Sequence, residues 1–323
     1  MWYKQPAQNH FEALPLGNGK LGAMIFGGIA KEQITLNQDT LWSGYADRQY
    51  PVIESRKYLD QVRSLIMEGK IHEAQQLADS KMLGHWSESY MPMGTLYLSF
   101  DQHSHADEYR LNLDLDTGVA SVDYRIEGVG YRRRCFVSYP DGVMVLHLQA
   151  DRKQMLSFDF TADSLLRHQV RTSDDCLIME GQCPDHVEPN YVSNVPTPVV
   201  YEQDPKGMLF VVTACVKADE SAVVSAEDSS VRVSNATECM IVLASENSFE
   251  SDDCFSDAMK RMRKAADQAY EVLYRRHIKD FSEVYQRNVL YLGEAPDLPM
   301  NERLRLFKEE NRSDPALYAD YYN

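Results

Sequence analysis

The sequence predicts a mainly β protein, a large antiparallel β-sandwich (super-sandwich) with an inserted αα-hairpin and with linker helices after it. Two observations lead to this prediction. Short β-type runs separated by Gly, Asp and Pro recur between about residues 20 and 246. After Ser251 the apolar residues recur at three and four positions, which is typical of helices. We therefore expect a sandwich over residues 1–250, a helical linker over 251–293 and the start of a further domain over 294–323.

The strands are indicated by alternation along the chain. In "VASVDY", Val119, Ser121 and Asp123 point to one face, and the residues between them point to the other. Comparable runs lie at 95–100, 143–148, 208–217 and 240–244. Short strands at such close intervals favour antiparallel sheets over a βαβ array.

Two amphipathic stretches interrupt the first part of the sandwich, over about residues 53–83. On each side of Gly69 the apolar residues share one helical face: Leu59, Val62, Leu65 and Ile66, then Ile71, Ala74, Leu77 and Ala78. We expect an αα-hairpin that packs on the sandwich. Near the end of the sequence, helix-start chemistry at Asn301 and Pro315 predicts two more helices. The last of these is too short to be stable alone, so we expect the front part of a longer protein.

The composition excludes several partners. Lys and Arg number 33 against 49 Asp and Glu, a net charge of −16, which argues against nucleic acid and anionic membranes as partners. No leader and no bilayer-length apolar stretch is visible, so we expect a soluble, cytoplasmic protein. The cysteines lack metal-type spacing, and we expect all of them to be buried thiols. They are Cys135, Cys176, Cys183, Cys215, Cys239 and Cys254.

The stretch "GNGKLG" has the G-x-G-x-x-G pattern of dinucleotide-binding sites, with Asp39 about twenty residues later. That motif needs a helix directly after the glycines, because the pyrophosphate binds at a helix N-terminus. Here residues 20–26 read as a strand and 32–37 as a returning strand, so we expect no cofactor. The loop is instead expected to be a structural turn, built by Gly17, Asn18, Gly19 and Gly22.

Several stretches in collinear order resemble glycoside hydrolase family 95, the α-L-fucosidase family. "EALPLGNGKLGAMIFGG" and "ITLNQDTLWSG" resemble its opening signature. "YMPMGTLYLSF", "YRLNLDLDTGVASVDY" and "VGYRRRCFVSYPDGVMVLHL" are similar to the stretches that follow. "HIKDFSEVYQRNVLYLG" and "LPMNERLRLFKEENRSDPALYADYY" resemble the linker into the catalytic domain. Lys20 and Gln38 depart from the family pattern, where arginine and glutamate are expected.

The resemblance implies a β-sandwich, a helical linker and then an (α/α)6 barrel with the catalytic machinery. It implies inverting hydrolysis, in which a glutamic acid protonates the leaving oxygen while a water is activated on the opposite face of the sugar. Those residues belong to the barrel, so no catalytic residue is assigned to residues 1–323. The implied partners are the barrel and a fucosylated oligosaccharide. The glycine loop is expected to face the barrel.

Two stretches supply candidate substrate contacts. Asn37, Asp39 and Trp42 combine polar groups with an aromatic face, which suits a sugar; the alternative is a capped turn with a buried tryptophan. The long loop 183–198 carries His186, Glu188, Asn190 and Tyr191, and its alternative is an ordinary surface loop. His186 and Glu188 lack a third ligand at useful spacing, so no metal site is expected. His103 and His105 are interpreted as solvated turn residues.

Three functional hypotheses follow. The first is a non-catalytic front part of a family 95 hydrolase, which stabilises the barrel and shapes the rim of its active site. The second is a free-standing carbohydrate-binding β-sandwich without hydrolase activity. The third, an independently active hydrolase, has no support in the spacing of the residues.

Overall fold

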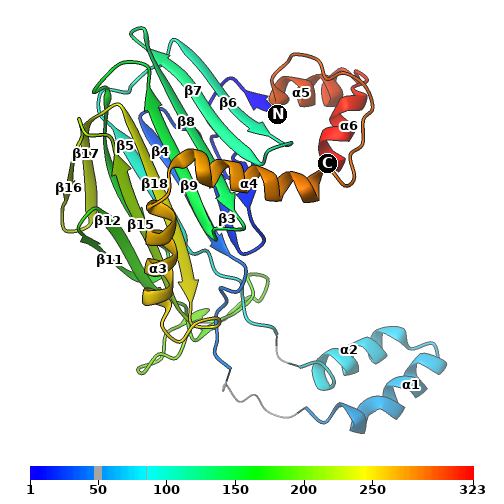
Figure 1. Ribbon diagram of the computed structural model, residues 1–323. Coiled ribbons are helices and arrows are strands. Elements are labelled where there is room, and N and C mark those ends of the chain that lie inside the picture. Colours follow the sequence, from blue (N-terminus) through cyan, green and yellow to red (C-terminus); the bar gives the residue numbers. More distant parts are fainter. Residues whose placement is uncertain (47–52, 85) are drawn as a thin grey trace. The chain divides into compact units, whose positions relative to one another are not determined.

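The computed structural model describes residues 1–46, 53–84 and 86–323 (Figure 1). Its contacts divide the chain into two compact units. Unit 1 comprises Met1–Leu41, Met91–Cys183 and Leu209–Asn323, and unit 2 comprises Trp42–Tyr90 and Pro184–Met208.

A nine-stranded antiparallel sheet forms one layer of unit 1. Its strands in spatial order are β1 (Trp2–Tyr3), β6 (Glu108–Asp114), β7 (Val119–Ile126), β8 (Val129–Ser138), β9 (Val143–Ala150), β18 (Glu238–Asn247), β15 (Leu209–Ala218), β12 (Cys176–Gln182) and β11 (Arg167–Ser173).

A seven-stranded antiparallel sheet forms the second layer. Its strands in spatial order are β16 (Val223–Ala226), β17 (Ser230–Ala236), β10 (Leu156–Asp163), β5 (Gly94–Phe100), β4 (Lys31–Gln38), β3 (Leu21–Ile25) and β2 (Leu14–Gly17). The inward residues of both sheets are large and fully buried, among them Phe158, Phe160, Leu98 and Leu111. Since such residues alternate with polar ones along each strand, the two layers enclose one core. The predicted mainly β sandwich is confirmed.

The first hairpin explains the glycine pattern. Gly17 at the end of β2 pairs with Gly22 in β3. Between them, the Asn18 side-chain oxygen accepts hydrogen bonds from the backbone N–H of Lys20 at 3.0 Å and of Leu21 at 2.8 Å. Gly19 has a φ of 88°, a conformation that glycine adopts without steric cost. A strand, β3, follows the glycines, and the loop joins two paired antiparallel strands.

Two helices cover part of the outer face of the nine-stranded sheet, the face turned away from the second sheet. They are α3 (Cys254–Ala266) and α4 (Tyr270–Tyr285), and both lie across this sheet in Figure 1. Met262 of α3 and Leu273 of α4 are fully buried against outward residues of the sheet such as Phe136 and Val242. The sheet thus has an apolar core on both sides.

Two shorter helices follow, α5 (Met300–Glu309) and α6 (Pro315–Tyr322). As the sequence indicated, Pro315 lies in the first turn of α6, and the Asp314 carboxylate caps the helix by accepting from Leu317 N–H at 3.1 Å. Arg303 of α5 donates to Asp314 at 2.8 Å and to Asp320 at 2.5 Å, so a buried arginine ties the two helices together.

Unit 2 contains a short 3-10 helix, η1 (Ser55–Tyr58), the hairpin helices α1 (Leu59–Met67) and α2 (Ile71–Lys81), and the two-stranded pair β13 (His186–Val187) and β14 (Val199–Val200). The αα-hairpin therefore forms where the apolar periodicity predicted it. Ala74 is its only buried residue among those described, and its packing on the sandwich stays a prediction. Among the described residues, no helix is both long and apolar enough to cross a bilayer.

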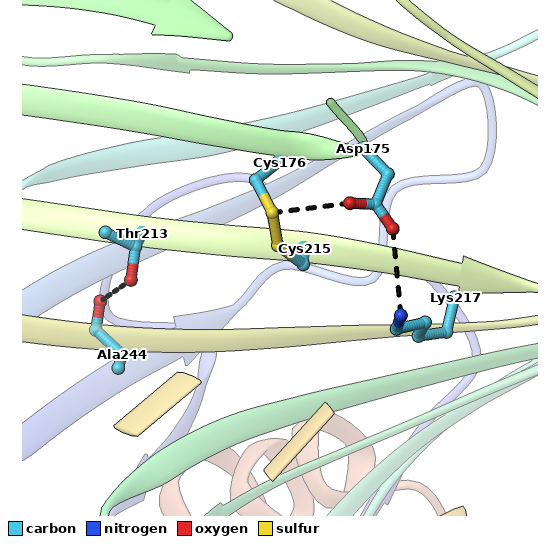
Figure 2. The surroundings of a disulfide bond; sticks show 6 residues. All are labelled: Asp175, Cys176, Thr213, Cys215, Lys217 and Ala244. Atoms are coloured by element: carbon cyan, nitrogen blue, oxygen red, sulfur yellow. Dashed lines mark hydrogen bonds and ion pairs between the residues drawn. A yellow bond between two sulfur atoms is a disulfide. The ribbon is translucent and has the colours of Figure 1, made fainter. Parts of the chain in front are cut away.

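The cysteine expectation is wrong for one pair. Cys176 of β12 and Cys215 of β15 form a disulfide, drawn in Figure 2 with the neighbouring Asp175 and Lys217. These strands are antiparallel neighbours, and their register places the two cysteines directly opposite each other, with Cα atoms 4.0 Å apart. The register could not be read from two cysteines 39 residues apart. Cys135, Cys183 and Cys239 are buried thiols as expected, whereas Cys254 is only partly buried.

Candidate functional site

Unit 2 holds a compact group of polar side chains, Ser43, Glu88, His186 and Glu188, which we call the Glu88–His186 cluster. Glu88 Oε1 lies 2.8 Å from His186 Nδ1, and Glu188 Oε1 lies 3.0 Å from Nε2 of the same ring. Ser43 Oγ donates to Glu88 Oε2 at 2.7 Å. The side chains of His186, Glu88 and Glu188 are 19%, 18% and 25% exposed.

Backbone pairing brings these distant residues together. Trp42 and Tyr90 form an antiparallel bridge, and Gly44 N–H donates to Pro184 O at 2.9 Å. Val187 N–H donates to Glu88 Oε2 at 3.2 Å, which fixes the carboxylate against β13. Three short segments of the chain are therefore held in register around one carboxylate.

A second carboxylate orders the long loop. Asp185 is fully buried and accepts backbone hydrogen bonds from Glu202 at 2.9 Å, Lys206 at 2.5 Å and Gly207 at 3.0 Å. A buried carboxylate that accepts several N–H groups stabilises a loop that has little apolar core. The loop after residue 183 is thus held by hydrogen bonds from its backbone to the Asp185 carboxylate.

The two nitrogens of the His186 ring face different carboxylates. A carboxylate only accepts hydrogen bonds, so His186 bonds to Glu88 and Glu188 together only when both ring nitrogens carry hydrogen. Because the carboxylates lie at opposite ring nitrogens, they cannot both join His186 Nδ1 in binding a single ion.

Two exposed aromatic pairs belong to the same unit. Trp42 and Tyr90 are 42% and 39% exposed, with ring centroids 5.6 Å apart. Trp86 and Tyr191 are 55% and 69% exposed, with centroids 5.5 Å apart. Exposed aromatic rings can pack on the C–H faces of sugars, and carboxylates can accept hydrogen bonds from sugar hydroxyl groups. The alternative of a buried tryptophan at position 42 is wrong.

The remaining candidate substrate contacts, Asn37, Asp39 and Asn190, are divided between the two units. Asn37 lies in β4 of unit 1 and lines a shallow groove of about 230 Å³. Asp39 follows this strand, where its backbone N–H donates to Lys20 O at 3.0 Å. Asn190 is exposed in the loop of unit 2, beside Tyr191. The structure brings His186 and Glu188 together in unit 2, whereas Asn37 and Asp39 belong to unit 1.

Sequence reasoning missed Ser43, Glu88, Trp86 and Tyr90. Glu88 is 98 residues from His186, and no periodicity links two loops so far apart. The signal that could have found them is the stretch "WSESY", in which two aromatic residues and a carboxylate alternate with serines.

His103 is also placed differently from the expectation of a solvated turn. It is 4% exposed, stacks on Phe100 with centroids 5.2 Å apart, and Nδ1 lies 3.0 Å from Tyr124 Oη. Burial, and then the charge of Arg133, lower the pKa of His103 to about 4. Among the described residues, Asp175, Cys176 and Cys215 are the one group of His, Cys, Asp or Glu side chains whose ligand atoms all lie within 4.8 Å of one another, and its cysteines form the disulfide.

Comparison with known proteins identifies the family to which this chain belongs. Residues 1–252 match the family model described as glycosyl hydrolase family 65, N-terminal domain. The chain belongs to this family. The match covers the strands of both sheets, so the family's N-terminal domain is the sandwich described above.

The chain is also similar to curated proteins that are named as fucosidases. The chain is 30% identical to "Alpha-L-fucosidase 2" of Arabidopsis thaliana, over 97% of this chain and 39% of that protein. It is 26% identical to "Probable alpha-fucosidase A" of Aspergillus niger, over 92% of this chain and 38% of that protein. The resemblance to α-L-fucosidases is confirmed, and the chain spans about two fifths of the length of these relatives.

A solved structure with a similar arrangement is the "Putative kojibiose phosphorylase from human microbiome". It has a TM-score of 0.48 and 9% sequence identity, over 84% of this chain and 35% of that one.

Proposed function

We propose that residues 1–323 are the N-terminal, non-catalytic part of a family 95 glycoside hydrolase, an inverting α-L-fucosidase that acts on α-1,2-linked fucose. The single observation that carries the proposal is the collinear match to "Alpha-L-fucosidase 2", which covers 97% of this chain but 39% of the relative. The acid and the water-activating residues then belong to the (α/α)6 barrel, which is the intramolecular partner.

The Glu88–His186 cluster is our candidate for the rim of the active site. Its carboxylates are held by His186, Ser43 and Val187, so they can accept hydrogen bonds from sugar hydroxyls without first being ordered. Trp86 and Tyr191 offer exposed rings to the same ligand. In this proposal unit 2 binds the part of a fucosylated oligosaccharide beyond the cleaved bond.

A groove beside α4 is our candidate contact for the barrel. It has a volume of about 470 Å³ and is lined by Gly17, Asn18, Tyr139, Phe281 and Val284. Tyr139 is 69% and Val284 62% exposed, so this groove offers apolar surface that another domain could cover. The groove also borders the glycine loop, which we expect to face the barrel.

Fucose release from 2′-fucosyllactose tests the proposal. Residues 1–323 alone should release no fucose, whereas a longer protein that includes the following domain should do so with inversion at the anomeric carbon. Steady release by residues 1–323, in proportion to their concentration, would place the catalytic residues in this chain and overturn the proposal.

The second candidate function is a carbohydrate-binding module, which the two exposed aromatic pairs favour. Calorimetry distinguishes the two. Binding of 2′-fucosyllactose by residues 1–323, with no activity in the longer protein, favours the module.

We propose a cytoplasmic location, and the disulfide is the observation that argues against it. Disulfides persist mainly in oxidising compartments, so the Cys176–Cys215 bond removes the argument from free thiols. Fractionation of cells that express the natural protein tests the location.

A further inference from the structure

The outer face of the nine-stranded sheet has two halves of opposite character. The half that α3 and α4 cover is apolar. The other half carries a row of polar residues that face one another across five strands: Arg110, Asp123, Arg132, Gln149 and Glu238. We call this row and its flanks the polar half-face. It forms a concave surface with a volume of about 550 Å³.

Most charged groups of the polar half-face are held in place. Arg132 Nε donates to Asp123 at 2.5 Å, and Arg125 donates to Gly128 O at 2.9 Å and to Asp151 at 3.4 Å. Glu238 lies 2.7 Å from Nε2 of His147, a buried ring that stacks on Tyr270 of α4 at 3.9 Å. The helix that covers the apolar half thus positions a carboxylate of the polar half.

The Arg110 guanidinium and the Gln149 amide are the two donors of the row that a ligand could use. The Arg110 guanidinium stacks on the Trp2 indole, with its carbon 4.2 Å from the ring centroid. Within the part of the chain that the structure describes, neither this guanidinium nor the Gln149 amide makes a hydrogen bond. A stacked guanidinium is ordered while its N–H groups stay available.

The charges of this surface nearly cancel. Its lining includes three arginines and four carboxylates: Arg110, Arg125, Arg132, Glu108, Asp123, Asp151 and Glu238. Such a lining attracts neither polyanions nor polycations, but it offers many fixed donors and acceptors. That chemistry matches a ligand with many hydroxyl groups and no net charge.

We propose that the polar half-face is a second binding site, for a neutral oligosaccharide. The hydroxyl groups of the ligand accept from Arg110 and Gln149 and donate to Asp123 and Glu238, while Trp2 holds Arg110 in position. This site lies in unit 1 and involves none of the residues of the Glu88–His186 cluster. It does not depend on the proposed catalytic role of the longer protein.

NMR titration of residues 1–323 with 2′-fucosyllactose, and separately with the anionic 3′-sialyllactose, tests the proposal. We expect the neutral sugar to shift the amide resonances of β6 to β9 and the Gln149 side chain. Arg110→Ala should weaken this binding roughly tenfold, since it removes a charge-assisted hydrogen bond. Gln169→Ala, an exposed glutamine on β11 of the same sheet, is the matched control and should change nothing.

His186→Ala separates this proposal from the preceding one. Shifts in β6 to β9 that survive His186→Ala and weaken in Arg110→Ala support the second site. Shifts confined to unit 2 support only the rim, and they overturn the second site. Equal binding by wild type and Arg110→Ala, or equal affinity for the sialylated sugar, also overturns it.

Discussion

Glu32 and Arg133 carry opposite charges inside the sandwich core, where they are 1% and 3% exposed. Arg133 Nη1 donates to Glu32 at 2.8 Å and Nη2 donates to Gly28 O at 2.6 Å, while Gly27 N–H donates to Glu32 at 2.8 Å. The guanidinium also lies 5.0 Å from the ring centroid of Tyr124. The pair therefore links β4 to β8 across the two sheets.

Removing only the cation should be much more damaging than replacing the pair. Arg133→Met leaves Glu32 buried and unpaired, and we expect a loss of about 3–5 kcal/mol in the free energy of unfolding. The double variant Glu32→Gln/Arg133→Met should recover part of this loss, because the amide still accepts from Gly27. Urea denaturation measures both. A double variant that is less stable than Arg133→Met would contradict this account.

His103 predicts a pH dependence of stability. Its pKa in the folded protein is about 4, below the ordinary value of 6.5, because burial disfavours the charged ring. The unfolded chain therefore binds the proton first, and the stability that neutral His103 contributes is lost as pH falls from about 6.5 to about 4. In the variant His103→Gln, the free energy of unfolding should depend less on pH between about 6.5 and about 4. The melting temperatures of the wild type and of His103→Gln, measured between pH 4 and 7, check this prediction. If the melting temperatures of the two proteins fall in parallel as the pH is lowered, His103 does not cause the pH dependence.

At the scale of elements, α4 is buried to different extents along its length. Leu273 is fully buried against the sheet, whereas Val284, three turns later on the same helix, is 62% exposed. We expect Leu273→Ala to destabilise residues 1–323 by about 2–5 kcal/mol. Val284→Ala is the matched control and should have almost no effect. If both variants unfold at the same urea concentration, the packing of α4 described here is wrong.

The disulfide links two neighbouring strands of the large sheet. We expect the variant Cys176→Ala/Cys215→Ala to lose about 2–4 kcal/mol, since the cross-link restricts the unfolded chain. The wild type should lose stability in a reductant that opens the bond, while the variant should not respond. Equal responses of the two proteins to reductant would show that the bond does not contribute to stability.

At the scale of the whole molecule, the two units are stabilised by different forces. Unit 1 has a continuous apolar core, whereas the loops of unit 2 depend on Asp185 and the Glu88–His186 cluster. Loops with few apolar contacts open locally, at a free energy below that of global unfolding.

Glu88→Gln should therefore act locally. It keeps the shape of the side chain but removes the charge that His186 faces, so we expect faster amide hydrogen exchange at residues 43–46 and 184–192. The sheets of unit 1 should exchange as in the wild type, and the urea midpoint should stay unchanged. Faster exchange across β8 and β9 would contradict an independent role for the cluster.

The fold class, the first hairpin, the αα-hairpin helices and the linker helices could be predicted from the sequence because each depends on local periodicity and turn chemistry. Alternation marks a strand wherever it lies, and Asn18 with Gly19 specifies a tight turn by itself. The family resemblance was visible for the same reason, since it rests on short stretches in collinear order.

Tertiary structure alone decided which distant residues meet. The register of β12 against β15 paired Cys176 with Cys215, and the meeting of two loops placed Glu88 on His186. The burial of His103 and the exposure of Trp42 likewise depend on what packs above them. Local sequence carries the period of an element, whereas strand register and loop contacts are set by the packing of the whole core, which no single stretch encodes.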